Sequence, residues 1–183
     1  MDGKYKRRLH RLPDRFYRGT AAIHWVHCIK DRKTGWLNET HHSSVREALL
    51  HAMSRSCLCC PAYTLMPDHL HILWLGCDEQ SDQISAMRMF RKQWKGLLGN
   101  DEPMIQPYDH LLRPDERNKR GFARVAEYIW MNPVRKDLLQ NWEDWPYSGA
   151  LFPGYPSLDP RKYHFWENFW NAYADCMAGK SSW

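Results

Sequence analysis

Two apolar runs, at residues 63–66 and 69–75, are separated only by Pro67 and Asp68. A Pro-Asp pair between short apolar runs is typical of a turn between two strands. The sequence therefore predicts a β-hairpin over residues 61–75. Side chains alternate along a strand, so His69 and His71 are expected to point to the same face of the sheet.

The remaining segments suggest how this hairpin is embedded. We expect a strand at residues 22–29, a helix at 45–56 with Ser43 or Ser44 as N-cap, and a helix that starts at Ser81-Asp82 or Ser85 and runs to about Leu98. A short extended segment at 105–113 and a helix at 122–131 follow, while the aromatic-rich tail is irregular or marginally helical. This order predicts an α+β fold, a ferredoxin-like β-α-β-β-α-β antiparallel sheet with an additional tyrosine-bearing helix. The His pair would then lie on the open face of the sheet, where the last helix could cover it.

Length and charge limit the organisation of the chain. With 183 residues and 43% hydrophobic content, it can form one well-cored domain. We expect a basic arm at residues 1–18, a domain at 19–150 and a C-terminal extension at 151–183. The arm contains seven Lys and Arg but only two Asp, which accounts for the whole net charge of +5. No apolar run suggests a membrane span or a secretory leader, so a cytoplasmic protein is expected.

The basic residues suggest contacts with nucleic acid, although a solvated surface is an equally ordinary explanation. In the helix before residue 98, apolar side chains share one face and Arg88, Arg91, Lys92 and Lys95 share a neighbouring one.

The six cysteines show no CxxC pair. Cys57, Cys59 and Cys60 are a possible zinc cluster, particularly with two histidines close behind them. Adjacent cysteines would project in different directions, however, and zinc sites usually space their ligands by two to four residues. Buried free thiols are the favoured interpretation.

The last predicted helix carries Tyr128 and Asn132, one turn apart and therefore on one face. A phenol has a pKa near 10 and is a poor nucleophile at neutral pH without help. Two imidazoles and one amide oxygen could bind Mg²⁺ or Mn²⁺, with positions left for a phosphate that the cation would polarise. Taken singly these residues are weak signals, but together they suggest cleavage of a nucleic acid through a phosphotyrosine.

The motif Pro-Asp-His-Leu-His-Ile-Leu-Trp at residues 67–74 resembles the HUH motif of single-tyrosine transposases. Glu-Tyr-Ile-Trp-Met-Asn-Pro-Val-Arg at 127–135 resembles the tyrosine helix of one branch, the REP-associated tyrosine transposases. Segments 107–113 and 144–148 agree with the same branch. The resemblance spans roughly residues 17–155.

This resemblance implies a metal-dependent single-strand DNA endonuclease and strand transferase that acts on palindromic hairpins. It implies that His69, His71 and Asn132 hold Mg²⁺ or Mn²⁺ and that Tyr128 forms the 5′-phosphotyrosine. The expected DNA contacts are Arg7, Arg8, Arg18, Gly19, Thr20, Arg88, Arg91, Lys92, Lys95 and Arg113. The family's Gly-Thr-Trp-Ser-like tetrapeptide reads Gly-Thr-Ala-Ala at residues 19–22, which leaves the recognised sequence open. The alternative is a non-cleaving DNA- or RNA-binding protein of the same fold, and either would be a monomer or a homodimer.

Overall fold

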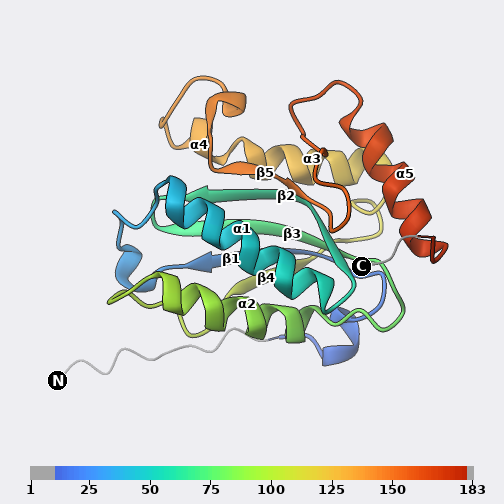
Figure 1. Ribbon diagram of the computed structural model, residues 1–183, viewed down its shortest axis with the longest axis horizontal. Helices are drawn as coiled ribbons and strands as arrows, with labels where there is room; N and C mark the ends of the chain where they lie inside the picture. Colours follow the sequence, from blue (N-terminus) through green and yellow to red (C-terminus); the bar gives the residue numbers. More distant parts are fainter. Residues whose placement is uncertain (1–10, 181–183) are drawn as a thin grey trace.

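The strands of the protein form one antiparallel sheet in the order β4-β1-β3-β2-β5 (Figure 1). A computed structural model describes residues 11–180. The strands are β1 (Ala22–Cys28), β2 (Leu58–Met66), β3 (His69–Gly76), β4 (Tyr108–Leu111) and β5 (Ser148–Leu151). The first four have the predicted ferredoxin-like order, and β2 and β3 form the predicted hairpin around Pro67 and Asp68. The fifth strand, which was not predicted, extends the sheet beside β2.

Helices cover both faces of the sheet. The longer ones are α1 (Glu39–Ser54), α2 (Gln83–Leu97), α3 (Lys119–Trp130) and α5 (Phe165–Met177), with a single turn, α4 (Asn132–Arg135), after α3. The short 3-10 helices are η1 (Asp14–Tyr17), η2 (Lys30–Arg32) and η3 (Trp142–Asp144). No helix in the described part of the chain is long and apolar enough to cross a membrane.

Strand alternation divides the buried side chains into two cores. Ile23 and Ile72 point toward α1 and α2, whereas their neighbours Ala22 and Leu73 point toward α3 and α5. Both faces of the central strands are therefore covered. Every residue of β2 and β3 is buried. This is why these strands are almost continuously apolar rather than alternating.

Two helix starts differ from the prediction. Helix α1 begins six residues before residue 45 because the side chain of Asn38, not Ser44, accepts a hydrogen bond from the backbone N–H of His41. Helix α3 begins at Lys119, capped by Asn118. The predicted cap of α2 at Asp82 is confirmed.

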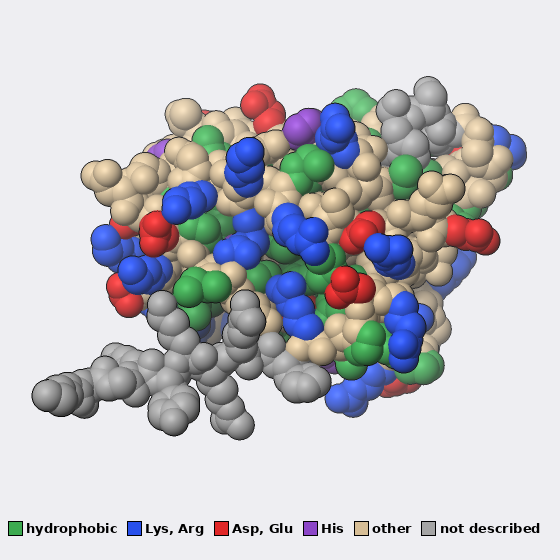
Figure 2. All heavy atoms as spheres, turned by 90° about the horizontal axis from the view of Figure 1, so that it is seen from below, with side chains coloured by type: hydrophobic (Ala, Val, Ile, Leu, Met, Phe, Trp, Pro, Cys, Tyr) green, Lys and Arg blue, Asp and Glu red, His purple; other side chains and the backbone are tan. Residues whose placement is uncertain are grey.

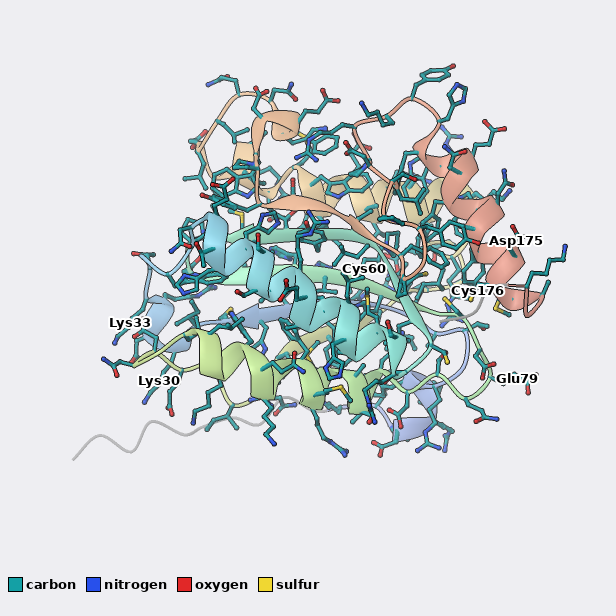
Figure 3. All side chains as sticks on the ribbon, in the orientation of Figure 1. Lys30, Lys33, Cys60, Glu79, Asp175 and Cys176 are labelled. Carbon is teal, nitrogen blue, oxygen red and sulfur yellow. The ribbon has the colours of Figure 1, made fainter. Side chains whose placement is uncertain are left out.

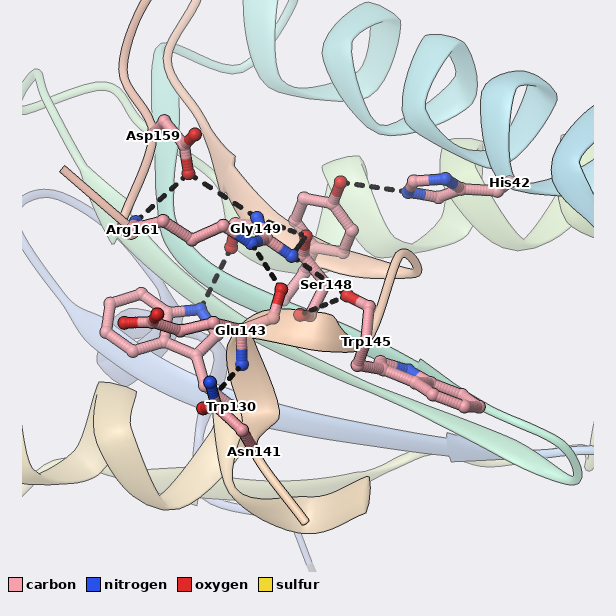
Figure 4. Close-up of polar contacts among 10 residues, drawn as sticks. His42, Trp130, Asn141, Glu143, Trp145, Ser148, Gly149, Asp159 and Arg161 are labelled. Carbon is pink, nitrogen blue, oxygen red and sulfur yellow. Dashed lines mark hydrogen bonds and ion pairs between the residues drawn. The ribbon is translucent and has the colours of Figure 1, made fainter. Parts of the chain in front are cut away.

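A partly exposed polar cluster attaches the C-terminal segment to the residues just before β5 (Figure 4). The Arg161 guanidinium donates to the backbone carbonyls of Glu143 at 2.8 Å and Trp145 at 2.9 Å. Nearby, the Trp130 indole donates to the carbonyl of Gly149 at 3.1 Å. The boundary expected between residues 150 and 151 falls inside β5, so the C-terminal segment continues directly from the sheet.

Candidate active site

The two histidines of the hairpin converge on one point. His69 and His71 alternate with buried apolar residues of β3 and face the α3 side, and their Nε2 atoms are 3.1 Å apart. Asp68, in the turn, accepts a hydrogen bond from Nδ1 of His69 at 2.5 Å and pairs with Arg32 at 2.9 Å. This contact fixes the His69 ring so that Nε2 presents its lone pair.

A third histidine, which the sequence reasoning missed, holds the second ring. Nε2 of His24 on β1 lies 2.9 Å from Nδ1 of His71, and the two rings stack. With the proton on His71 Nδ1, this contact leaves Nε2 of His71 unprotonated as well. His24 is also opposite His110 of β4, whose ring bonds Glu116 at 3.0 Å.

Burial keeps these imidazoles neutral. It lowers the pKa of His71 to about 2, helped by His24 and His69, and lowers the pKa of His24 to about 4. Burial also lowers the pKa of His69, although Asp68 opposes the shift. For Asp68, burial acts to raise the pKa, but the hydrogen bond with His69 and the charge of Arg32 outweigh it and lower the value. The site thus combines neutral ring nitrogens with a carboxylate.

Tyr128 lies across the same face on α3. Its side chain is 46% exposed, and its ring stands edge-on to His24 with centroids 6.2 Å apart. The guanidinium of Arg135, another residue that the sequence reasoning missed, lies 4.4 Å from the centre of the Tyr128 ring. This cation–π contact places a positive charge beside the Tyr128 ring. The phenol is therefore accessible and placed beside the buried histidines.

Asn132 is buried at the start of α4, which contacts β2. Its amide nitrogen donates to the backbone carbonyls of Tyr128 at 2.9 Å and Ile129 at 3.1 Å. These bonds fix the side chain and leave its oxygen without a hydrogen bond within residues 11–180.

An open pocket of about 520 Å³ joins the tyrosine to the histidines. It is lined by His24, Val26, His71, Tyr108, His110, Asp115, Glu116, Gly121, Arg124, Val125 and Tyr128. His69 and Asn132 lie outside this lining. Both acidic and basic side chains reach the pocket.

The two converging imidazoles fit a cation. Nitrogen ligands about 2.1 Å from an octahedral ion, at right angles to each other, are roughly 3 Å apart, as the Nε2 atoms of His69 and His71 are. Among residues 11–180, no cluster of three or more His, Cys, Asp or Glu side chains has metal-binding geometry. An oxygen ligand such as Asn132, or the substrate itself, would have to complete the coordination.

The cysteines are placed apart from this site. Cys59 belongs to the core beneath α3 and α5, whereas its neighbour Cys60 belongs to the core beneath α1 and α2. Figure 3 shows Cys60 on β2 and Cys176 on α5. All six thiols are free, and two neighbours on opposite faces of a strand cannot join one zinc centre.

The predicted DNA contacts are dispersed. Arg7 and Arg8 lie outside the described residues. Arg18 pairs with Asp82 at 3.4 Å, while the backbone N–H of Gly19 donates to Ser81 and Thr20 is exposed. Arg113 is exposed near the active-site pocket, and its backbone N–H donates to Glu116.

The basic residues of α2 face away from the histidines, because α2 covers the opposite side of the sheet. Arg91 donates to the carbonyl of Met104, and Lys95 pairs with Glu102 at 3.0 Å. The side chains of Arg88 and Lys92 are both exposed. Figure 2, seen from the side where α2 lies, shows Lys and Arg interspersed with Asp and Glu.

Comparisons with known proteins show what the sequence and the fold are similar to. No family model matches the sequence. The REP-associated tyrosine transposase of Escherichia coli (strain K12) is 25% identical over 122 residues, which are 66% of this chain and 70% of the relative. A solved structure described as the REP-associated tyrosine transposase bound to a REP hairpin has the same fold. It is 21% identical with a TM-score of 0.64, and the match covers 76% of this chain and 82% of that one. The resemblance predicted from the sequence is confirmed: this chain is similar to the REP-associated tyrosine transposase of Escherichia coli and has the fold of the solved one.

Proposed function

We propose that this protein cleaves and rejoins single-stranded DNA beside a hairpin, with Tyr128 as the nucleophile and a divalent cation at the His pair. The observation that supports this most directly is that the pocket beside the exposed Tyr128 also reaches His71, whose Nε2 lies 3.1 Å from Nε2 of His69. The curated relative is named a transposase, and the solved neighbour is described as bound to a REP hairpin. We assign a hairpin substrate to this protein on the basis of that similarity.

The chemistry is a transfer of a phosphodiester to a phenol. Tyr128 Oη bonds to the scissile phosphorus, and the bond from phosphorus to the 3′ oxygen breaks. The phenolic proton passes to water at the open mouth of the pocket, and the departing 3′ oxygen takes up a proton. The products are a 5′-phosphotyrosine and a free 3′ hydroxyl. Attack by that or another 3′ hydroxyl reverses the step, so rejoining needs no external energy source.

Neighbouring side chains position the reacting groups. Asp68 and His24 orient the two imidazoles, and Asn132 offers an amide oxygen held by its backbone contacts. Arg135 offers a positive charge beside the Tyr128 ring, where the phosphate arrives. A bound Mg²⁺ or Mn²⁺ would supply Lewis-acid polarisation of the phosphate and stabilise the leaving oxygen.

Tyr128→Phe tests the nucleophile. Incubated with single-stranded hairpin DNA and Mn²⁺, the wild type is expected to form a denaturant-resistant protein–DNA adduct, and the variant is expected to form none. Hairpin affinity should change little, because only one hydroxyl is removed. Tyr108→Phe is a matched control, since Tyr108 lines the same pocket and is similarly exposed. Retention of the adduct by Tyr128→Phe, with its loss in Tyr108→Phe, would move the nucleophile to Tyr108.

Removal of the cation tests the second half of the proposal. A chelator, His69→Ala or His71→Ala should each stop adduct formation, and Mn²⁺ or Mg²⁺ should restore it in the chelated wild type. Asn132→Ala should have a smaller effect, because water can replace an amide oxygen. Full cleavage in the presence of chelator would contradict the metal assignment.

The alternative function is binding without cleavage on the same fold. Its supporting observation is the wide, charged pocket, which a nucleic acid could fill without reacting. The adduct assay separates the two, because a binding protein would retain the hairpin on a native gel and form no covalent product.

A further inference from the structure

A second groove, of about 380 Å³, lies between α3 and α5. It is lined by Lys119, Arg120, Ala123, Trp166, Glu167, Trp170 and Asn171. The α5 side of the groove belongs to the C-terminal segment, which lies beyond the motifs that resemble the transposases. Nothing in the proposed cleavage chemistry uses it.

Two tryptophans form the floor of this groove. The rings of Trp166 and Trp170 are nearly parallel, with centroids 6.2 Å apart and planes inclined by 22°. Phe122 packs against both rings from the core, which holds them in place. Both indoles remain partly exposed. A partly exposed, fixed indole is a surface on which a nucleobase of any type can stack.

Two cations border the tryptophans. The ammonium of Lys119 lies 6.0 Å from the centre of the Trp170 ring, and Arg120 is exposed on the next position of α3. Neither forms an ion pair within residues 11–180. The one carboxylate in the lining, Glu167, interacts with His164 at 3.1 Å. The groove therefore favours an aromatic ligand that carries negative charge.

The groove and the active-site pocket are both bordered by α3. Arg120 lines the groove and Arg124, one helical turn later, lines the active-site pocket. At 1.5 Å per residue, Lys119 and Tyr128 are separated by roughly 13 Å along the helix axis, a few nucleotides of extended DNA.

We infer that the groove between α3 and α5 binds the unpaired DNA strand next to the cleavage site, with bases stacked on Trp166 and Trp170. Lys119 and Arg120 contact its phosphates. This inference rests on the proposed function, because the strand that enters the groove is the one held at Tyr128. It also gives the C-terminal helix a part in substrate binding.

Fluorescence anisotropy with labelled (dT)12 and the full-length chain tests the inference. Lys119→Gln combined with Arg120→Gln should weaken binding and reduce the slope of log affinity against log salt by up to about 1.4, or about 0.7 for each phosphate contact. Trp166→Ala and Trp170→Ala should each weaken binding roughly five- to a hundredfold with an unchanged salt slope, since stacking carries no charge. Two control variants change the opposite face of the molecule. Arg46→Gln on α1, combined with Arg55→Gln just after its end, removes the same number of charges, and Phe16→Ala removes a partly exposed aromatic ring.

The outcomes separate this inference from the cleavage proposal. Loss of (dT)12 affinity in the groove variants, with none in the controls, supports the groove. Because Lys119 and Arg120 are exposed, their substitution tests it even if a tryptophan variant fails to fold. Equal affinity and salt slope in wild type and charge variant, or no (dT)12 binding by wild type, would overturn it. If the groove variants change the sedimentation coefficient of the protein but not its DNA binding, the groove is a contact between copies of the chain. That result would also overturn the inference. The Tyr128 adduct assay judges cleavage independently of all of these.

Discussion

The two faces of β1 hold histidines in different surroundings. His24 faces the candidate active site, whereas His27 points into the core beneath α1 and α2. There the His27 ring is 0% exposed, lies 4.9 Å from the Trp94 ring and contacts the carbonyl oxygen of Met104 through Nε2 at 2.9 Å. Burial lowers the pKa of His27 to about 4. A cation there would have no carboxylate to offset its loss of hydration.

His27 should make the protein less stable in mild acid. Its pKa is about 4 when folded and about 6.5 when unfolded, so the unfolded chain binds the extra proton between these values. Stability is present above pH 6.5 and is lost as the pH falls toward 4, with a slope of at most about 1.4 kcal/mol per pH unit from this residue. Urea unfolding at several pH values measures the slope. His27→Gln should flatten it, and an identical pH profile in the variant would contradict the assignment.

The residues found from the sequence were those with local spacing. His69 and His71 are two apart on a strand, and Tyr128 and Asn132 are one turn apart, so each pair shares a face whatever the fold. His24 could not be found in this way, because its contact with His71 depends on the register between β1 and β3. The adduct and metal experiments test whether these residues have the predicted catalytic roles.

Helix α3 is held close to the loop before it, and a glycine makes this possible. A Cβ at Gly121 would stand 2.3 Å from the backbone oxygen of Asp115 and 2.8 Å from Cα of Glu116. The same loop carries the carboxylate that contacts His110, so this close approach shapes one wall of the active-site pocket.

Gly121→Ala should therefore destabilise the protein, although alanine is the better helix former. At Gly96 in α2, where an added Cβ would meet nothing within 4 Å, the same change should stabilise by about 0.5–1 kcal/mol. At Gly121 the overlap with rigid backbone should reverse the sign and cost about 1–3 kcal/mol. Urea unfolding of both variants tests the difference. A similar gain at both positions would show that the loop before α3 gives way without cost.

Element boundaries were less predictable than element order. The cap of α1 is Asn38, earlier in the chain than the serines chosen from the sequence, because several polar residues competed for that position. Helix α3 begins at Lys119, three residues before its predicted start at 122. Strand β5, with the sequence Ser-Gly-Ala-Leu, has no β-branched or aromatic residue, and it forms because β2 offers an unpaired edge.

At the scale of the whole molecule, the second core depends on the C-terminal helix. Phe169 of α5 is 0% exposed and packs against Phe152 and Phe165, in the core that also contains α3. The ferredoxin-like topology follows from the order of the elements, which the sequence pattern predicted. The position of α5 against the sheet could not be predicted from the sequence, because the residues that it contacts lie far away along the chain.

Phe169→Ala should lower the free energy of unfolding by about 3–5 kcal/mol, as is usual when a large aromatic core side chain is removed. Tyr163→Ala is the control, because this side chain is 96% exposed and its loss should change stability by no more than about 0.5 kcal/mol. Denaturant unfolding compares the two. A negligible effect at Phe169 would mean that the segment beyond β5 is only loosely attached.

The proposed cleavage joins Tyr128 covalently to DNA. Single-stranded hairpins with randomised flanks would be incubated with the protein and Mn²⁺, and the protein would then be digested with protease and nuclease and sequenced by tandem mass spectrometry. The proposed mechanism predicts that a nucleotide phosphate is attached to the peptide that contains Tyr128 and to no other peptide. A phosphodiester mapped to another tyrosine, or none despite cleaved DNA, would contradict it.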